Sequence, residues 1–248
     1  MERQTDMEMF DCVIRQLQDV DDVLLMEGHN KSHKKVSDAL DLLNWAEDML
    51  PSMALHCMAT RHSTRRFKQE PVDVEKLRQV IEAGRQAPSG KNKQQNHFLV
   101  VRDPDVLDTL ARLVREEFAG MEITDENSED IGNAIRLSKK GTYVFHYHAP
   151  TLIIVANKRG YGNRYADTAC AIENMMLAAN ALDLGSCWIN QLRWLKDNPV
   201  LLDYLCELGM QEDEQVFGSL SLGYPDTEDG LPNRKILPIR GNEVTYIG

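Results

Sequence analysis

The residues of this sequence that are best suited to bind a ligand form the basic segment Arg61-His62-Ser63-Thr64-Arg65-Arg66-Phe67-Lys68. The chain has a formal net charge of −11, yet this segment holds four Lys and Arg residues and no acid. Cations packed this closely repel one another, and an anionic ligand would offset that repulsion. Because guanidinium and hydroxyl groups donate readily to phosphate oxygens, the segment indicates a phosphate site. An ordinary basic surface patch is the alternative interpretation.

A second local excess of positive charge lies near the end of the chain. Residues 232–248 contain Arg234, Lys235 and Arg240, and no acid precedes Glu243. A C-terminal tail is usually solvated, which is the simpler interpretation. The alternative is that the two basic stretches converge on one phosphate.

Motifs for other chemistries are missing from the sequence. There is no G-x-x-x-x-G-K-[ST], no G-x-G-x-x-G between a strand and a helix, no H-E-x-x-H and no G-x-S-x-G. The five cysteines are odd in number and show no C-x-x-C spacing, which argues against a disulfide framework or a thiolate cluster. His146 and His148 flank Tyr147, but two ligands without a third are weak evidence for a metal, so a loop or pocket wall is favoured. No metal site is predicted.

Composition limits the class of protein. A chain of 248 residues with 42% hydrophobic and 27% charged residues is typical of a globular domain with an appendage. Its acidic balance argues against a nucleic-acid binder. The apolar runs are far shorter than the ~20 residues that cross a bilayer, so no membrane partner is expected. The N-terminus lacks the basic and apolar regions of a signal peptide, which predicts a cytoplasmic protein.

The elements that would position the basic residues alternate between helices and strands. Asp73 and Asp103-Pro104 are typical helix starts, and the continuous apolar run over 151–156 predicts a buried strand. The helix predicted over 165–182 is apolar nearly all round, so it must be covered on two sides. In a chain of this size we expect the second cover to be another subunit. Further strands are predicted over 97–102, 185–192 and 216–224.

Two other stretches have a distinct character. Residues 1–50 carry apolar side chains at intervals of three or four, which predicts a helical N-terminal extension to a domain over 51–248. Residues 116–147 are polar and acidic, which is the composition of a mobile cover over a site.

The basic segment is followed by Ala87-Pro88-Ser89-Gly90-Lys91-Asn92-Lys93-Gln94 and then by the apolar run 98–101. Farther along stands Gly185-Ser186-Cys187-Trp188-Ile189-Asn190. In order and spacing, these stretches resemble the FMN-dependent nitroreductase family over roughly residues 52–248. The resemblance implies an α+β fold with a mixed central sheet flanked by helices. It also implies an intertwined homodimer with FMN at the subunit interface.

The resemblance assigns roles to single residues. Arg61 and the pair Arg234-Lys235 match residues that bind the flavin phosphate, and Arg65 matches a cation near N1 and O2 that would stabilise the reduced flavin. His62 and Ser63 match residues along the ribityl chain and ring. The implied cofactor-binding set is Arg61, His62, Ser63, Arg65, Pro88, Ser89, Gly90, Asn92, Trp188, Ile189, Asn190, Arg234 and Lys235.

Within that set, Pro88, Ser89 and Gly90 match a loop contributed by the second subunit, and Asn92 matches the amide that reaches the ring edge. Trp188 and Ile189 match residues against one flavin face, and a backbone N–H near Asn190 is expected to point at N5. No catalytic side chain is implied, because flavin N5 carries the chemistry. Cys187 is interpreted as a packing residue.

The implied function is an oxidoreductase with tightly bound FMN. NADH or NADPH would give a hydride to N5 and leave, and a nitroaromatic, quinone or other conjugated molecule would then be reduced. A reductive dehalogenase or ene-reductase of the same superfamily is one alternative. A flavin-binding sensor or partner module that uses residues 1–50 is an alternative of another class.

Three positions depart from the family pattern. Gln95-Asn96 replaces Pro-Trp, so we expect a less rigid loop without an aromatic wall. Gly90 replaces a serine and removes one hydroxyl. Asn190-Gln191 replaces small residues and puts two amides where the substrate pocket would open. Flavin binding is expected to survive these changes, whereas substrate specificity need not.

Overall fold

The structure, a computed structural model, describes residues 16–26, 29, 32, 34–37, 40, 54–125, 127–129, 131–238 and 241–248. The chain divides into two compact units, Met1–Met58 and Ala59–Gly248. In the first unit, residues 16–26 and 34–37 are helical, and most of the predicted N-terminal extension lies outside the described residues. No helix in the described part of the chain is long and apolar enough to cross a membrane.

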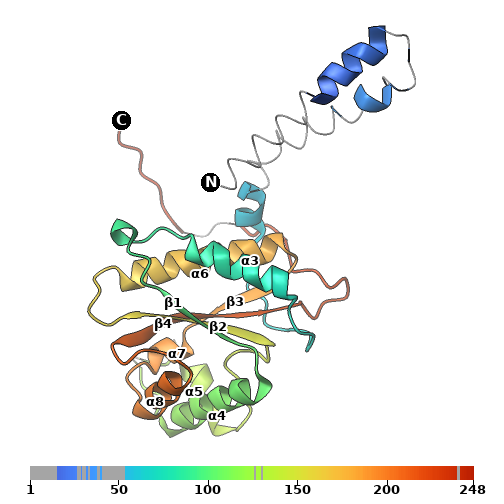
Figure 1. The fold of residues 1–248 in the computed structure, drawn as a ribbon. Helices are drawn as coiled ribbons and strands as arrows, with labels where there is room; N and C mark the ends of the chain where they lie inside the picture. The colour runs from blue at the N-terminus through green and yellow to red at the C-terminus, as the bar shows by residue number, and fades with distance from the viewer. Residues whose placement is uncertain are drawn as a thin grey trace. The chain divides into compact units, whose positions relative to one another are not determined.

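The second unit is built on a four-stranded sheet (Figure 1). The strands are β1 (His97–Val101), β2 (Thr151–Lys158), β3 (Gly185–Ile189) and β4 (Glu214–Gly223), in the order β1-β2-β4-β3. The apolar run in β2 is buried, as predicted. Its side chains alternate between two cores, because successive residues of a strand point to opposite faces.

Every neighbouring pair of strands in this sheet is antiparallel. The prediction of a mixed sheet is therefore wrong for these four strands. Strands β2 and β3 do run in the same direction, as expected of strands joined through one helix, but β4 lies between them. Among described residues, the one parallel pairing is an isolated bridge between Ser63 and Ser186.

Helices α3 (Val74–Arg85) and α6 (Arg164–Ala181) cover one face of the sheet (Figure 1). Helix α3 begins as predicted, because the Asp73 side chain accepts hydrogen bonds from two N–H groups of the first turn. The two helices pack closely at Gly84, where an added Cβ would lie 2.8 Å from Met175 Cγ. This layer encloses the first apolar core.

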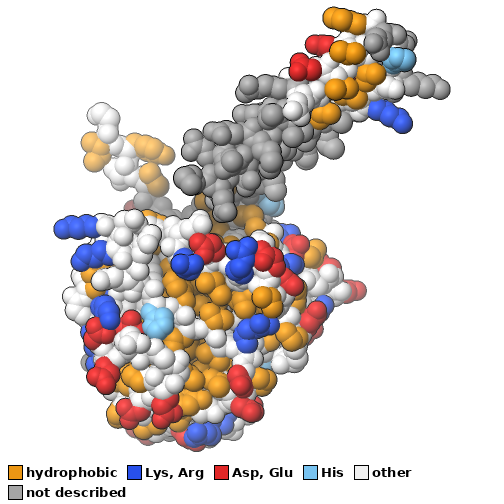
Figure 2. All heavy atoms as spheres, in the orientation of Figure 1, with side chains coloured by type: hydrophobic (Ala, Val, Ile, Leu, Met, Phe, Trp, Pro, Cys, Tyr) orange, Lys and Arg blue, Asp and Glu red, His pale blue; other side chains and the backbone are white. Residues whose placement is uncertain are grey.

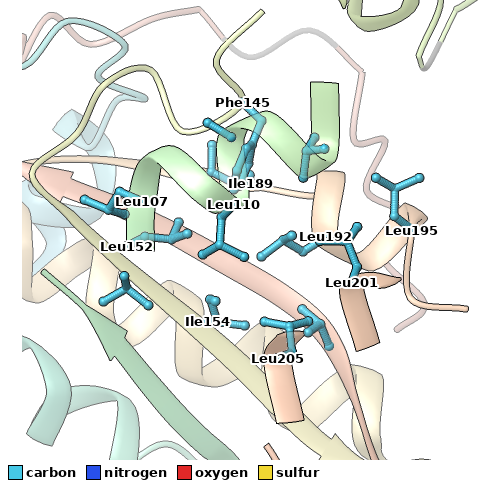
Figure 3. Packing of buried hydrophobic residues seen from close by; sticks show 14 of the residues in the cluster. Leu107, Leu110, Phe145, Leu152, Ile154, Ile189, Leu192, Leu195, Leu201 and Leu205 are labelled. Atoms are coloured by element: carbon cyan, nitrogen blue, oxygen red, sulfur yellow. The ribbon is translucent and has the colours of Figure 1, made fainter. Parts of the chain in front are cut away.

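Helices α4 (Pro104–Gly120), α5 (Gly132–Lys139), α7 (Gln191–Trp194) and α8 (Pro199–Glu207) cover the other face (Figure 1). Their apolar side chains pack against the sheet in a second core. Figure 3 shows part of this core: Leu107, Leu110, Phe145, Leu152, Ile154, Ile189, Leu192, Leu195, Leu201 and Leu205.

The region predicted as a mobile cover, residues 116–147, belongs to this second core. Helix α4 continues to Gly120, and Phe118, Ile135 and Phe145 are fully buried. Although the region is polar overall, α5 buries Ala134 and Ile135 against α4, so the helix is a packed element of the core.

Charged side chains of both signs are interspersed over the face of the second unit that Figure 2 shows, around apolar side chains that lie between the two helical layers. On this face, the described residues form no extended basic surface of the kind that binds nucleic acid. The positive charge relevant to a ligand is instead concentrated in the segment 61–68.

Candidate functional site

The basic segment is fastened to the ends of β3 and β4. The Thr64 N–H donates to the Ser186 carbonyl oxygen at 2.8 Å, and the Lys68 N–H donates to the Tyr224 carbonyl oxygen at 2.9 Å. The segment lies so close to β3 that a Cβ on Gly185 would come within 2.6 Å of Thr64 Cγ2. Glycine at position 185 therefore permits the contact that orients the basic side chains.

The C-terminal stretch meets this segment, as one of the two interpretations of the sequence predicted. The His62 Nε2 atom lies 2.5 Å from the carbonyl oxygen of Lys235. Arg61, Ser63 and Arg65 lie around the side chain of Cys187 on β3. We call Arg61, His62, Ser63, Arg65 and Lys235 the basic cluster.

The Cys187 thiol is 2% exposed, and burial raises its pKa. The nearby Arg65 and Arg61 guanidinium groups and a hydrogen bond with Ser63 act in the opposite direction without reversing the shift. A thiol with a raised pKa stays protonated near neutral pH, so it is a poor nucleophile. The interpretation of Cys187 as a packing residue agrees with this environment.

The cations of the basic cluster are only partly neutralised. Arg61 Nε lies 3.6 Å from Glu173 Oε1. The Arg65 guanidinium lies over the Tyr147 ring, 5.9 Å from its centroid. Among the described residues, no carboxylate forms an ion pair with Arg65 or Lys235. The cluster therefore carries a net positive charge that favours an anion.

Arg234 was predicted to bind a phosphate together with Lys235, but in this structure its guanidinium binds Asp183 and Asn180. Its Nη2 atom lies 2.8 Å from Asp183 Oδ1 and also donates to the Asn180 carbonyl oxygen. A cation at this position satisfies a carbonyl at the C-terminal end of α6 and complements the helix dipole. In this structure Arg234 supports the helix end next to the basic cluster.

The amides after β3 form a chain of hydrogen bonds. The Trp188 Nε1–H donates to Asn190 Oδ1 at 3.0 Å, and the Asn190 backbone N–H donates to Gln191 Oε1 at 3.1 Å. The Gln191 Nε2 group then donates to the Tyr143 hydroxyl at 2.7 Å. The N–H that was expected to point at flavin N5 is therefore bonded to Gln191.

Tyr143 is a residue of this site that sequence reasoning did not place. It lies 48 positions before Gln191, and no motif links the two. Burial raises the pKa of Tyr143 to about 12, so its hydroxyl stays protonated while it accepts the hydrogen bond from Gln191.

The loop with Pro88, Ser89, Gly90 and Asn92 is held at the other end of α6. The Gly90 N–H donates to Asp167 Oδ1 at 3.1 Å, and the Tyr161 hydroxyl donates to the Gly90 carbonyl oxygen at 3.1 Å. A Cβ on Gly90 would lie 2.0 Å from Asn163 Nδ2. A side chain at position 90 would therefore displace the Asn163 and Tyr161 side chains from their present positions.

The Asn96 side chain, in the loop that was predicted to be less rigid, forms three hydrogen bonds. Its Oδ1 atom accepts hydrogen bonds from Asn157 Nδ2 at 2.8 Å and from the Thr168 hydroxyl at 3.2 Å. Its Nδ2 group donates to the Asp167 carbonyl oxygen at 3.0 Å. A polar network thus holds Asn96, which stands where the family pattern has Trp, and the rigidity of the loop stays a prediction.

Within one chain, the loop with Pro88, Ser89, Gly90 and Asn92 lies far from the basic cluster. The loop contacts Asp167 at the start of α6, whereas Arg234 contacts Asn180 near its end. At 1.5 Å per residue, these two positions are about 20 Å apart along the helix axis. No hydrogen bond or ion pair between described residues connects the loop with the cluster. The described residues also include no group of three His, Cys, Asp or Glu side chains placed to hold a metal.

The model of the Nitroreductase family matches residues 58–224, which is most of the chain. The chain belongs to the Nitroreductase family, and it is an oxidoreductase of that family.

Similar proteins agree with this assignment. A protein of Archaeoglobus fulgidus, provisionally named NADH dehydrogenase/NAD(P)H nitroreductase, is 28% identical over 174 residues, which cover 70% of this chain and 86% of that protein. A solved nitroreductase with bound FMN from Bacteroides fragilis is 34% identical, with a TM-score of 0.69 and coverage of 79% of this chain and 98% of that one. Another with bound FMN, from Desulfitobacterium hafniense, is 25% identical, with a TM-score of 0.66 and the same coverage.

Proposed function

We propose that this protein is an FMN-dependent NAD(P)H oxidoreductase that reduces a nitroaromatic, a quinone or another conjugated molecule by a ping-pong reaction. The observation that carries the proposal is the basic cluster, in which residues from opposite ends of the domain meet beside β3. The FMN bound to two similar structures and the NAD(P)H in the name of a relative support the same conclusion.

The basic cluster fits the phosphate end of FMN. Arg61, His62, Ser63 and Lys235 would hold that end of the cofactor, since they offer cationic and hydroxyl donors with little competition from acids. Arg65 would present its positive charge to the ring, where negative charge accumulates on reduction. Arg234 would act indirectly, by fixing the end of α6 and the start of the tail.

FMN, when bound, supplies the capacity to accept a hydride from NADH or NADPH and to pass it to the second substrate. Residues of this chain would shape the site around it. Trp188 and Ile189 on β3 would form a wall, and the hydrogen-bond chain through Asn190, Gln191 and Tyr143 would position the backbone that follows β3. The two amides would also make the substrate pocket more polar than a pair of small residues would.

A homodimer is part of the proposal. Pro88, Ser89, Gly90 and Asn92 resemble a cofactor-binding loop, yet in one chain they lie far along α6 from Arg234 and the end of that helix. A second copy would bring its own loop to the basic cluster of the first. The exposed residues of α6, such as Glu173 and Tyr165, would be candidates for the contact between subunits.

The two alternative functions gain no specific support. Glu122 and Lys139, two charged residues of the region predicted as a mobile cover, form an ion pair with each other at 3.1 Å. Residues 1–50, which a sensor module would use, lie mostly outside the described residues. The cytoplasmic location stays a prediction, and the proposal includes either NADH or NADPH as the reductant.

The first test is the visible absorption spectrum of the purified protein, followed by release and identification of any bound cofactor. We expect the bands of an oxidised flavin, FMN in the supernatant after heating, and bleaching by NADH or NADPH without oxygen. A colourless protein that takes up no added FMN would contradict the proposal.

The phosphate assignment is tested by Arg61→Ala. Loss of a charge-assisted hydrogen bond should weaken FMN binding by about 10- to 100-fold, so that dialysis removes the cofactor. Arg66→Ala is a matched control, because Arg66 belongs to the same segment but pairs with Asp226 at 3.1 Å and has a side chain that is 79% exposed. Full retention of FMN by Arg61→Ala, or equal loss in both variants, would refute the assignment.

A further inference from the structure

One buried amide lies between the two stretches of chain that form the basic cluster. Asn180, in the last turn of α6, is 3% exposed, and its Nδ2 group donates to the Thr60 hydroxyl at 3.2 Å. Thr60 is itself buried and immediately precedes Arg61 in the chain. Asn180 therefore holds the residue from which the first cation of the cluster extends.

The same residue also holds the C-terminal stretch. The Asn180 carbonyl oxygen accepts a hydrogen bond from Arg234 Nη2, and the side-chain Oδ1 atom lies 3.5 Å from Arg234 Nε. A guanidinium can only donate, so the amide oxygen must face Arg234, and the amide NH₂ group is left for Thr60. Arg234 immediately precedes Lys235, the second cation that Asn180 holds through its neighbour.

These contacts close a ring that contains two cations of the cluster. The His62 Nε2 atom, which lies 2.5 Å from the Lys235 carbonyl oxygen, completes it. In order, the ring consists of Asn180, Thr60, Arg61, His62, Lys235 and Arg234. Because the like charges of Arg61 and Lys235 repel each other, a fixed frame is needed to keep both close to one point.

The end of α6 is suited to keep Arg234 in this ring. Asp183 follows the helix with a φ of 62°, a left-handed conformation in which glycine is the usual residue at a helix end. A glycine there would relieve the backbone but would lack the carboxylate oxygen that lies 2.8 Å from Arg234 Nη2. The ion pair neutralises Arg234, so Lys235 is the cation of this pair that a ligand can use.

We propose that Asn180 is a positioning residue of the phosphate site, which directs Arg61 and Lys235 at one phosphate without contacting the ligand itself. Asn180 has this role only if the basic cluster binds the phosphate of FMN, as in the proposed function. A neutral amide suits the position, because a carboxylate there would add negative charge beside the phosphate.

The affinity for FMN relative to riboflavin tests this role, because the two flavins differ only in the phosphate. Equilibrium dialysis of the full-length protein, first freed of bound flavin, gives both dissociation constants. We expect the wild type to prefer FMN by about 100-fold or more, since charge-assisted hydrogen bonds hold the phosphate. Asn180→Ala should reduce this preference by about tenfold, with little change in the affinity for riboflavin.

Asn174→Ala is the matched control. Asn174 also lies on α6, but its Nδ2 group donates to the Ala83 carbonyl oxygen of α3 at 3.1 Å, so the preference for FMN should not change. A second pair of variants decides the question if Asn180→Ala does not fold. Thr60→Val removes the hydroxyl that accepts from Asn180 and Thr60→Ser keeps it, so Thr60→Val alone should lower the preference.

Equal weakening of FMN and riboflavin by Asn180→Ala and Thr60→Val would overturn the proposal, because it would mean that the amide supports the fold alone. An unchanged preference in these variants, or an equal fall in Asn174→Ala or Thr60→Ser, would overturn it as well. Failure of the proposed function gives a different result. A wild type that binds both flavins equally, or neither, would refute the phosphate site itself and the role of Asn180 with it.

Discussion

Lowering the pH should destabilise this protein through His146. Burial, then the neighbouring His148, lowers the pKa of the folded-state imidazole to about 4 from the ordinary value of 6.5, while the Ala149 backbone and Asp108 act in the opposite direction. At a pH between these two values, the His146 side chain therefore binds a proton in the unfolded chain but not in the folded chain. The stability that this group confers is complete above pH 6.5 and is lost as the pH falls towards 4.

The size of the effect follows from the shift. A difference of about 2.5 pKa units corresponds to about 3 kcal/mol in the free energy of unfolding, at up to about 1.4 kcal/mol per pH unit. Carboxylates elsewhere in the chain also respond to acid, so the contribution of His146 must be isolated by comparison with a variant.

His146→Phe supplies that comparison. The new ring would stay in contact with Phe145, whose ring centroid lies 5.3 Å from that of His146, and it would not titrate. Urea unfolding followed by circular dichroism at several pH values between 8 and 4.5 gives the free energy of unfolding of each protein. We expect the variant to be at least as stable at pH 8, since two unpaired nitrogens are removed, and to lose less stability in acid.

His148→Phe is the companion variant. It keeps His146 but removes the second cause of its shifted pKa, so part of the acid sensitivity should remain. Parallel stability curves for the wild type and His146→Phe would refute the reasoning, because they would mean that His146 takes up its proton equally well in the folded and unfolded chains.

Three further changes test the packing of the site by urea unfolding. Asn96→Ala should cost about 3 kcal/mol, because it leaves the buried Asn157 amide without its acceptor and removes two other hydrogen bonds, whereas the exposed Asn92→Ala should cost far less. Gly90→Ala should cost about 1–3 kcal/mol and displace Asn163, whose Nδ2 atom lies 2.0 Å from the added Cβ, and unchanged stability would contradict the close approach. Tyr143→Phe and Gln191→Ala should each destabilise the protein by about 1 kcal/mol. The double variant should cost less than the sum of the two, since both substitutions remove the same hydrogen bond between Gln191 and Tyr143. Strict additivity would mean that the bond contributes nothing.

Local features of the fold were predictable because each depends on residues that are close in sequence. Asp73 and Asp103 each accept N–H groups two and three residues ahead, so the helix starts are encoded within one turn. The apolar run of β2 required burial on both faces, and both cores receive its side chains. The basic segment, the loop over 87–94 and β3 are each short stretches of neighbouring residues. Their order along the chain therefore indicated the family from the sequence alone.

Features that depend on distant parts of the chain were predicted less well. The direction of neighbouring strands was wrong because β4, the last strand, inserts between β2 and β3. Arg234 binds Asp183, and Gln191 binds Tyr143. Each bond joins residues about fifty positions apart, and no sequence motif indicates either of them. The hydrogen bonds of Asn96 were not predicted because its partners come from β2 and α6.

Helix α6 links these observations. Its start holds the loop through Asp167, and its end receives Arg234, so the two halves of the implied cofactor set are fixed to opposite ends of one rigid element. A helix cannot shorten to bring its ends together, and the cost of unwinding it would far exceed the energy of a few hydrogen bonds. If both halves contact one FMN, we therefore propose that they come from different chains. In the proposed dimer, residues of the loop would therefore contribute to the cofactor site of the other subunit.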